Sequence, residues 1–307
     1  MMGQSVKLVL LAVVCCSYLA KAQTEIPDPF DQDAADSETS DVIDENSTNQ
    51  PERTGRIIGG TNADIANYPY MASMLVHSQY DPFYFGGVVI TATHVLTAAS
   101  SFNTMIVTSI VVRVGSSFLT KGGKTFNYKS YEMHNLHNLT TLANDVALVT
   151  IDGSFRGIPN VAPIRLEHHE YFISAAHPIN CFVLGWGDVV PGQLADRLQR
   201  SEYILLNHQQ CEAKWGPRPT SVQCAQSVRG NACHFDDGGP LMCNNRMYGV
   251  LSYFNQLDCE NTTSTKIHIF GKIPAPSIQI YLHRKLHDFG FGGKAMFVVA
   301  LRNSRME

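Results

Sequence analysis

From residue 57 onward, short runs of Val, Ile, Thr and aromatic residues recur along the chain, and Gly, Pro, Asn and Asp separate them. Short β-branched and aromatic runs bounded by turn-forming residues are typical of strands in an all-β barrel or sandwich. The clearest predicted strands are Tyr70–Val76, Phe85–Ile90, Val95–Ala98, Ile110–Val114, Val146–Ile151, Phe182–Trp186 and Met247–Tyr253. The pattern therefore favours an all-β fold.

One helical pattern is found, near the end of the chain. Its apolar residues, spaced three and four apart, are Ile278, Tyr281, Leu282 and Leu286. That spacing places them on one face and predicts a single amphipathic helix. Residues 289–307 follow as a glycine-containing tail whose role the sequence does not indicate, although it includes the short apolar stretch Ala295–Leu301.

The first 22 residues have the pattern of a secretory signal peptide. Lys7 precedes an apolar run, Leu8–Val14, and Ala20–Ala22 provides small residues at a favoured cleavage spacing. A run this short does not span a hydrocarbon core of about 30 Å, which argues against the alternative of a membrane anchor. We expect residues 1–22 to be removed and the protein to be secreted, with no association with a membrane.

Residues 23–56 form an acidic segment. Between Thr24 and Arg56 there are ten Asp or Glu and only two Arg, with few large apolar residues. Such a segment cannot bury enough apolar surface to offset its ordering entropy, so we predict a disordered propeptide. The whole chain has a net charge of −4 and a pI of about 6.3, which argues against a nucleic-acid-binding protein.

Secretion changes the interpretation of the eight cysteines. Cys15 and Cys16 are lost with the signal peptide, and six remain. An even number in an oxidising compartment predicts three disulfides, although the residues alone leave the pairing open. A zinc site is the alternative, but the chain has no CxxC ligand pair, and we interpret His134 and His137 as surface residues. We therefore predict no metal and no other cofactor.

Three Asn-x-Ser/Thr sequons become available for glycosylation on the secretory route. The acceptor residues are Asn46, Asn138 and Asn261. A sequon is only a permissive signal, so each is a candidate site.

Five motifs occur in a fixed order along the chain. They are Arg56–Gly60 (RIIGG), Phe85–Ile90 (FGGVVI) with Leu96–Ala99 (LTAA), Asn144–Leu148 (NDVAL), Cys181–Gly187 (CFVLGWG) and Asp236–Leu241 (DDGGPL). By these motifs the chain resembles the chymotrypsin- and trypsin-like serine proteases over residues 57–288. The resemblance implies two six-stranded antiparallel β-barrels with the active cleft between them and a C-terminal helix.

The resemblance also implies how the cysteines pair. The family's usual bridges correspond to Cys181–Cys243, Cys211–Cys224 and Cys233–Cys259. Another bridge that is common in the family is missing at both ends, since Phe85 and Ser101 stand at its two positions. All six cysteines outside the signal peptide are therefore used.

The catalytic machinery that the family requires is degenerate. Its peptidases use a serine nucleophile, a histidine base and an aspartate that orients the histidine. Ser100 stands at the histidine position and Asp237 at the serine position, whereas Asp145 retains the aspartate. Because loss of the serine or histidine of such a triad costs roughly a million-fold in turnover, we expect the chain not to be an enzyme.

Two neighbouring features differ from those of an active member. Phe235 replaces the glycine whose amide helps to bind the oxyanion, and Asn231 replaces the charged residue at the base of the trypsin specificity pocket. Phe254 stands where a glycine forms the pocket wall. Together with Tyr253, the two phenylalanines either fill the vacated pocket or contact a partner, because aromatic residues are enriched in interface hot spots.

The activation junction is the part of the family chemistry that remains. The resemblance implies cleavage after Arg56, which frees the amino group of Ile57 to pair with Asp236. The alternative is that these residues are inherited and have no present use. The stretch Ser116–Asn127 contains no Asp or Glu, so the calcium loop of some relatives is not expected.

The function that follows is that of a secreted serine protease homologue of the invertebrate type without catalytic activity. It would bind extracellular proteins, such as an active protease or its substrate, as a regulator, cofactor or decoy in an immune proteolytic cascade or a reproductive fluid. One alternative is a structural or storage component of a secreted fluid. Another is a hydrolase in which Asp237 is the nucleophile and His94 or His234 has become the base.

Overall fold

The computed structural model describes residues 60–80, 82–103, 105–174, 176–190, 192–253 and 265–287. Several predictions fall outside these residues. They concern the signal peptide 1–22, the acidic segment 23–56, the tail 289–307, Arg56, Ile57, Asn46, Asn261, Phe254 and Cys259. Among the described residues, no helix is long and apolar enough to cross a membrane.

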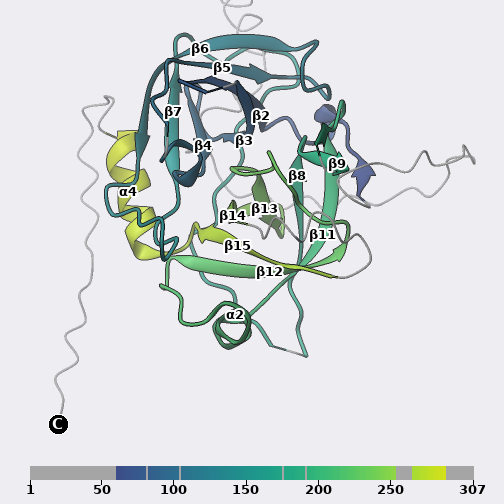
Figure 1. The fold of residues 1–307 in the computed structure, drawn as a ribbon, viewed down its shortest axis with the longest axis vertical. Helices are drawn as coiled ribbons and strands as arrows, with labels where there is room; N and C mark the ends of the chain where they lie inside the picture. Colours follow the sequence, from purple (N-terminus) through teal and green to yellow (C-terminus); the bar gives the residue numbers. More distant parts are fainter. Residues whose placement is uncertain are drawn as a thin grey trace, which may run out of the picture. The chain divides into compact units, whose positions relative to one another are not determined.

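The first half of the described chain forms a closed antiparallel barrel (Figure 1). Its strands are β2 (Met71–His77), β3 (Phe83–Val89), β4 (His94–Thr97), β5 (Ser109–Val114), β6 (Lys124–Met133) and β7 (Ala147–Ile151). They follow one another around the barrel in the order β2-β3-β4-β7-β6-β5, which leaves no strand edge unpaired. Two short 3₁₀ helices, η1 (Ile65–Asn67) and η2 (Ser100–Phe102), flank its strands.

The second half forms another barrel. Its strands are β8 (Asn180–Gly185), β11 (Gln199–Leu205), β12 (Val222–Arg229), β13 (Pro240–Cys243), β14 (Arg246–Tyr253) and β15 (Ile267–Lys272). Strand β11 pairs with both β12 and β8, which closes the ring of six strands, and β1 (Thr61–Asn62) pairs with the first two residues of β11. Strands β9 (Asp188–Val190) and β10 (Gln193–Leu194) form a separate hairpin. The predicted fold class, two six-stranded β-barrels with a C-terminal helix, is confirmed.

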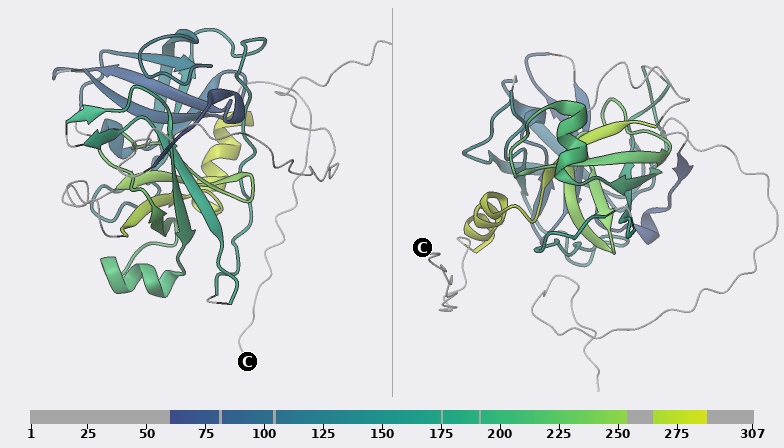
Figure 2. Two further views of the ribbon diagram at one scale, coloured as in Figure 1. Left: turned by 90° about the vertical axis from the view of Figure 1, so that its right-hand side faces the viewer. Right: turned by 90° about the horizontal axis from the view of Figure 1, so that it is seen from below.

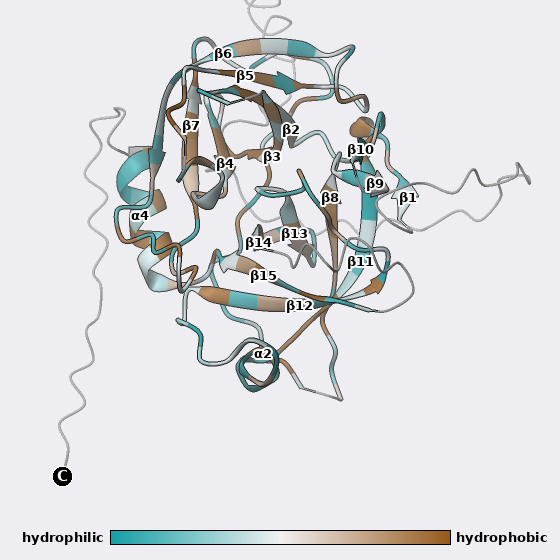
Figure 3. Cartoon of the chain, viewed as in Figure 1, coloured by the Kyte–Doolittle hydropathy of each residue, from teal (hydrophilic) through white to brown (hydrophobic). Residues whose placement is uncertain are grey.

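Alternating burial explains why these segments form barrel strands. Along β5, Ile110, Val112 and Val114 are buried while the residues between them are partly exposed, which is the period of a strand with one face in a core. In Figure 3, β7 and β8 are largely brown, which marks hydrophobic residues, whereas α2 (His208–Trp215) is mostly teal.

Among the described residues, two α-helices accompany the barrels, and the sequence predicted only one of them. Helix α4 (Pro276–His287) is the predicted amphipathic helix. Its buried residues include Ile278, Tyr281 and Leu282. Helix α2, which lies beside β12 and apart from α4 (Figure 2), corrects the prediction that only one helical segment exists. It lacks an apolar stripe and is defined by a capping box, in which Asn207 and Gln210 exchange side chain–backbone hydrogen bonds.

Candidate functional site

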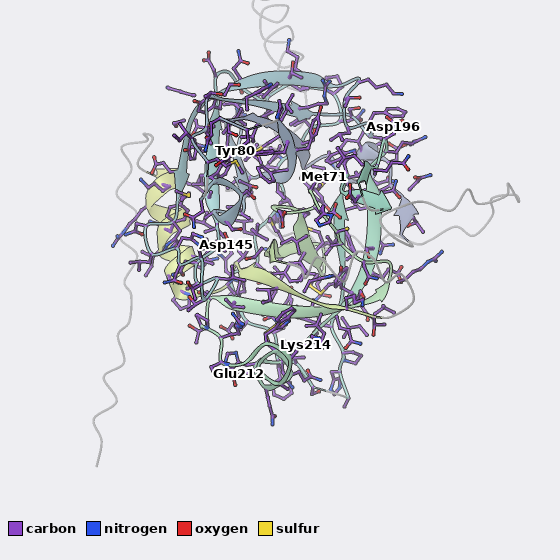
Figure 4. The ribbon with its side chains drawn as sticks, viewed as in Figure 1. Met71, Tyr80, Asp145, Asp196, Glu212 and Lys214 are labelled. Carbon is purple, nitrogen blue, oxygen red and sulfur yellow. A yellow bond between two sulfur atoms is a disulfide. The ribbon has the colours of Figure 1, made fainter. Side chains whose placement is uncertain are left out.

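The degenerate triad positions lie where the two barrels meet. Ser100 begins η2 after β4, Asp145 lies two residues before the start of β7, and Asp237 lies in the loop before β13. The amide of Gly86 in β3 donates a 2.8 Å hydrogen bond to the carbonyl oxygen of Asp237 and so joins the barrels. Asp145, labelled in Figure 4, lies between the strands of the two barrels.

Asp145 is fully buried, and its carboxylate is satisfied by two serines. The Ser100 amide donates to Oδ1 at 2.7 Å, and the Ser100 hydroxyl donates to Oδ2 at 2.7 Å. The Ser252 hydroxyl, from β14, also donates to Oδ2. The hydroxyl of Ser100 thus supplies the hydrogen bond that a histidine ring would otherwise give to this carboxylate.

His137 lies close to the same carboxylate. Its side chain is 5% exposed, and its Nδ1 is 3.8 Å from Oδ1 of Asp145 and 3.2 Å from the carbonyl oxygen of Ala143. At 3.8 Å the contact with Asp145 is electrostatic and not a hydrogen bond. The interpretation of His137 as a surface residue is therefore wrong.

His134 is also buried, contrary to the surface interpretation. It is 4% exposed, and its Nε2 lies 3.1 Å from the carbonyl oxygen of Ser277 in α4. The polar stretch that contains both histidines folds back against α4 and the barrel. Sequence context suggested solvent exposure, whereas long-range packing decides their burial.

Asp237 is held in a surrounding that disfavours its charged form. Burial raises the pKa of its carboxyl well above the ordinary value, and the nearby carboxyls of Asp236 and Asp145 raise it further. A carboxyl group whose pKa is raised in this way is a weaker nucleophile than a carboxylate, because it holds its proton to higher pH.

Asp236 precedes Asp237 in the loop before β13 and is fully buried. Its Oδ1 accepts a 2.7 Å hydrogen bond from the Gly187 amide, and its Oδ2 accepts a 2.9 Å bond from the Cys233 amide. A Cβ on Gly187 would lie 2.4 Å from the Asp236 Cγ, so the carboxyl approaches a backbone that only glycine allows. Burial raises the pKa of Asp236 to about 7, although its two hydrogen bonds lower it.

Phe235 occupies a backbone conformation that favours glycine. Its φ is +69°, in the left-handed region, which costs a non-glycine residue about 1–2 kcal/mol. Its ring meets the His234 ring edge-on, with centroids 6.4 Å apart. The oxyanion position therefore carries a bulky side chain on a strained backbone.

The base of the expected specificity pocket is neutral and internally paired. Asn231 is 4% exposed, and its Oδ1 accepts a 2.5 Å hydrogen bond from the Ser227 hydroxyl. The Tyr203 hydroxyl accepts from the Ala232 amide at 2.9 Å and shares a 2.7 Å bond with Nδ1 of His268. A basic side chain entering this region would meet no carboxylate at Asn231.

The two histidines proposed as replacement bases have other partners. Nδ1 of His94 lies 2.8 Å from the Thr91 hydroxyl, and Nδ1 of His234 lies 3.1 Å from Oδ2 of Asp188. Ligand atoms of Asp188, Cys233 and His234 lie within 4.8 Å of one another. Because the Cys233 sulfur is already in a disulfide, only two of these residues could bind a metal, and the group does not make a metal centre.

Disulfides hold the second barrel. The structure joins Cys181 to Cys243 and Cys211 to Cys224, the pairs that the resemblance implies. Cys233 is also disulfide-bonded. In the first barrel, the position of the missing bridge is filled by aromatic packing: the Phe85 ring lies edge-on to Phe102, with centroids 6.2 Å apart.

Comparisons with known proteins agree with this geometry. The family model described as Trypsin matches residues 57–273. Trypsin delta of Drosophila melanogaster is 29% identical over 212 residues, which cover 66% of this chain and 80% of that protein. Hypodermin-A of Hypoderma lineatum is 27% identical over 224 residues, covering 70% and 83%.

Two solved structures are similar in fold. The scabies mite inactivated protease paralogue S-D1 superposes with a TM-score of 0.64 at 21% identity, covering 74% of this chain and 97% of that one. HL collagenase gives a TM-score of 0.64 at 25% identity, covering 76% and 100%. One of these proteins is described as inactivated and the other as a collagenase, so the shared fold does not decide activity.

Proposed function

The chain belongs to the trypsin family of serine proteases, and on that premise we propose that it is a non-catalytic member that acts by binding other extracellular proteins. The observation that carries the proposal is the state of Asp145. Its buried carboxylate is saturated by Ser100 and Ser252, at the place where a peptidase needs a histidine.

The chemistry of the remaining side chains supports this proposal. The Ser100 hydroxyl donates its hydrogen bond to the Asp145 carboxylate and not to a histidine ring, which is the base that a triad uses. His137 approaches Asp145 through Nδ1, and its Nε2 is buried with no hydrogen-bonding partner in the part of the chain that the structure describes. A triad requires the second ring nitrogen of the histidine to reach a nucleophile. His137 therefore does not complete a catalytic triad.

Secretion belongs to the same proposal. Disulfides persist in oxidising compartments, and this chain contains them in its second barrel. The signal-like first residues point the same way. The partner would be an extracellular protein, such as an active protease or its substrate, and the role that of a regulator, cofactor or decoy.

A cleavage switch would regulate that binding. Asp236 is a buried carboxyl whose two oxygens are bonded only by backbone amides among the contacts described above. An ammonium group released at Ile57 by cleavage after Arg56 would stabilise its charged form. If the junction has no present use, the cut and the uncut protein should bind a partner equally well.

The proposal is tested by affinity capture from the native secretion with both forms as bait. One form is cut after Arg56, and the other is an uncut Arg56→Gln variant. Saturable, stoichiometric capture of one partner supports the binding role, and preference for the cut form supports the switch. No specific partner with either form would favour the structural or storage alternative.

A further inference from the structure

A groove lies between α4 and the end of β6. Figure 1 shows α4 beside the first barrel. Its volume is about 500 Å³, which is within the range of binding pockets of about 300–1,000 Å³. Its apolar lining consists of Met133, Leu136 and Ile280, and we call it the α4 groove. The catalytic positions of the family are not part of its lining.

The walls of the α4 groove are fixed by polar contacts. The Tyr281 hydroxyl of α4 donates a 2.7 Å hydrogen bond to the carbonyl oxygen of Glu132 in β6. The His134 ring packs against the Tyr281 ring, with centroids 4.8 Å apart, and Lys285 forms an ion pair with Glu132. Because these contacts fix α4 against β6, the groove is already formed before an occupant binds.

The apolar lining is unusually exposed. Met133, Leu136 and Ile280 are 37%, 63% and 52% exposed, and they come from a strand, a loop and a helix. Among the described residues, eight large hydrophobic side chains are exposed, and three of them line this one groove. Exposed apolar residues gathered in a concave site indicate a surface that is covered in the working molecule.

The sequence contains a segment suited to cover it. Ala295–Leu301 (AMFVVAL) consists of seven consecutive apolar residues, bounded by Lys294 and Arg302. It follows α4 after a short connection, Asp288–Lys294, that contains three glycines. No function described above uses this segment.

The segment can reach the groove of its own chain. The connection of seven residues spans up to about 24 Å when extended. The stretch of α4 from Ser277 to His287 covers eleven residues, whose ten helical rises span about 15 Å along the helix axis. A chain that leaves α4 at His287 is therefore able to turn back and lie along the groove. Attachment also gives the segment an effective concentration of about millimolar, which favours it over a separate protein.

From this geometry we infer that Ala295–Leu301 docks in the α4 groove of the same chain and buries Met133, Leu136 and Ile280. This docking contact does not involve the degenerate triad positions, and it does not depend on the proposed binding function. It explains both the exposed lining and the apolar tail with one interaction.

The test is hydrogen exchange of the full secreted chain, resolved by peptide, together with limited trypsin digestion at Lys294 and Arg302. We expect the amides of 295–301 to exchange at least about tenfold more slowly in the wild type than in Ile280→Asp, with slower cutting at both sites. Leu136→Asp, which changes the opposite wall, should have the same effect. Val228→Asp is the matched control, because Val228 is also 52% exposed but lies in β12.

Three results would overturn the inference. The first is rapid exchange of 295–301 in the wild type. The second is protection that Ile280→Asp and Leu136→Asp leave unchanged while near-UV circular dichroism shows that both variants are folded. The third is protection that disappears on dilution or cross-links that join two copies, which would assign the groove to another chain.

Discussion

At the scale of single residues, the site consists of the triad positions of the family, and their side chains form hydrogen bonds that differ from those of an active triad. Asp145 keeps its burial and its bond from the residue 100 amide, but a hydroxyl replaces an imidazole as the next donor. The substitutions Ser100 and Asp237 were visible in the sequence because flanking motifs fix their positions. His137 was not predicted, because its contact with Asp145 depends on the path of a loop that carries no sequence signal.

The hydrogen bond from Ser100 should stabilise the fold. Ser100→Ala leaves one oxygen of a buried carboxylate with fewer donors, and we expect a loss of about 1–3 kcal/mol in the free energy of unfolding measured in urea at pH 7. Ser101→Ala is the matched control, since the Ser101 hydroxyl is buried and has no hydrogen-bonding partner among the described residues. Equal effects of the two variants would contradict the role given to Ser100.

The raised pKa of Asp237 predicts a pH dependence. A carboxyl whose pKa is higher in the folded protein than its ordinary 3.8 stabilises the fold at low pH. That contribution is lost as the pH rises through the folded pKa. We therefore expect the stability advantage of Asp237→Asn over the wild type to grow with pH, starting above about pH 4. Thermal unfolding from pH 4 to 8 would measure it, and a constant difference between the two proteins would refute it.

At the scale of elements, the strands with one clearly buried face were predictable. In β5 the alternation of buried and exposed residues is regular, and the run Ile110–Val114 was recognised. Strand β6 was not predicted, because its sequence KTFNYKSYEM is largely polar and none of its residues is fully buried. Helix α2 was missed for a related reason, and the spacing of Asn207 and Gln210 was the signal that could have revealed it.

In the first barrel, aromatic packing should stabilise the region that the missing disulfide would otherwise hold together. Phe102 is 2% exposed, and its ring stacks on Tyr131 with centroids 4.9 Å apart, besides its contact with Phe85. We expect Phe102→Ala to destabilise the protein by about 3–5 kcal/mol in urea titrations. Phe172→Ala, at a residue that is 85% exposed, should change stability by less than about 0.5 kcal/mol. A small effect at Phe102 would show that other contacts hold this region.

At the scale of the whole molecule, the chain has the two-barrel fold of the family, with Ser100 and Asp237 at two of the three triad positions. The two barrels meet through the hydrogen bond between Gly86 and Asp237, so Asp237 stands at this junction, at the position that corresponds to the serine of an active member. The sequence predicted this architecture from motif order. It could not predict the α4 groove, which depends on how a helix and a strand far apart in the sequence pack together.

Cleavage after Arg56 should change the stability of the molecule if the switch operates. An ammonium paired with the buried Asp236 carboxyl offsets the cost of ionising it, and each unit of pKa lowering corresponds to about 1.36 kcal/mol. We expect the cut form to unfold at a higher temperature than the uncut Arg56→Gln form at pH 8. The difference should shrink toward pH 5, where Asp236 takes up a proton in the uncut form. Identical unfolding curves at both pH values would contradict the switch.

The central claim, absence of catalysis, is tested most directly by incubating protein cut after Arg56 with a diverse peptide library. New cleavage products are identified by mass spectrometry, with an Asp237→Ala variant run in parallel and an active trypsin as the positive control. The account predicts no product that is present with the wild type and absent with the variant. Products that depend on Asp237 would contradict it and establish a hydrolase with a rebuilt active site.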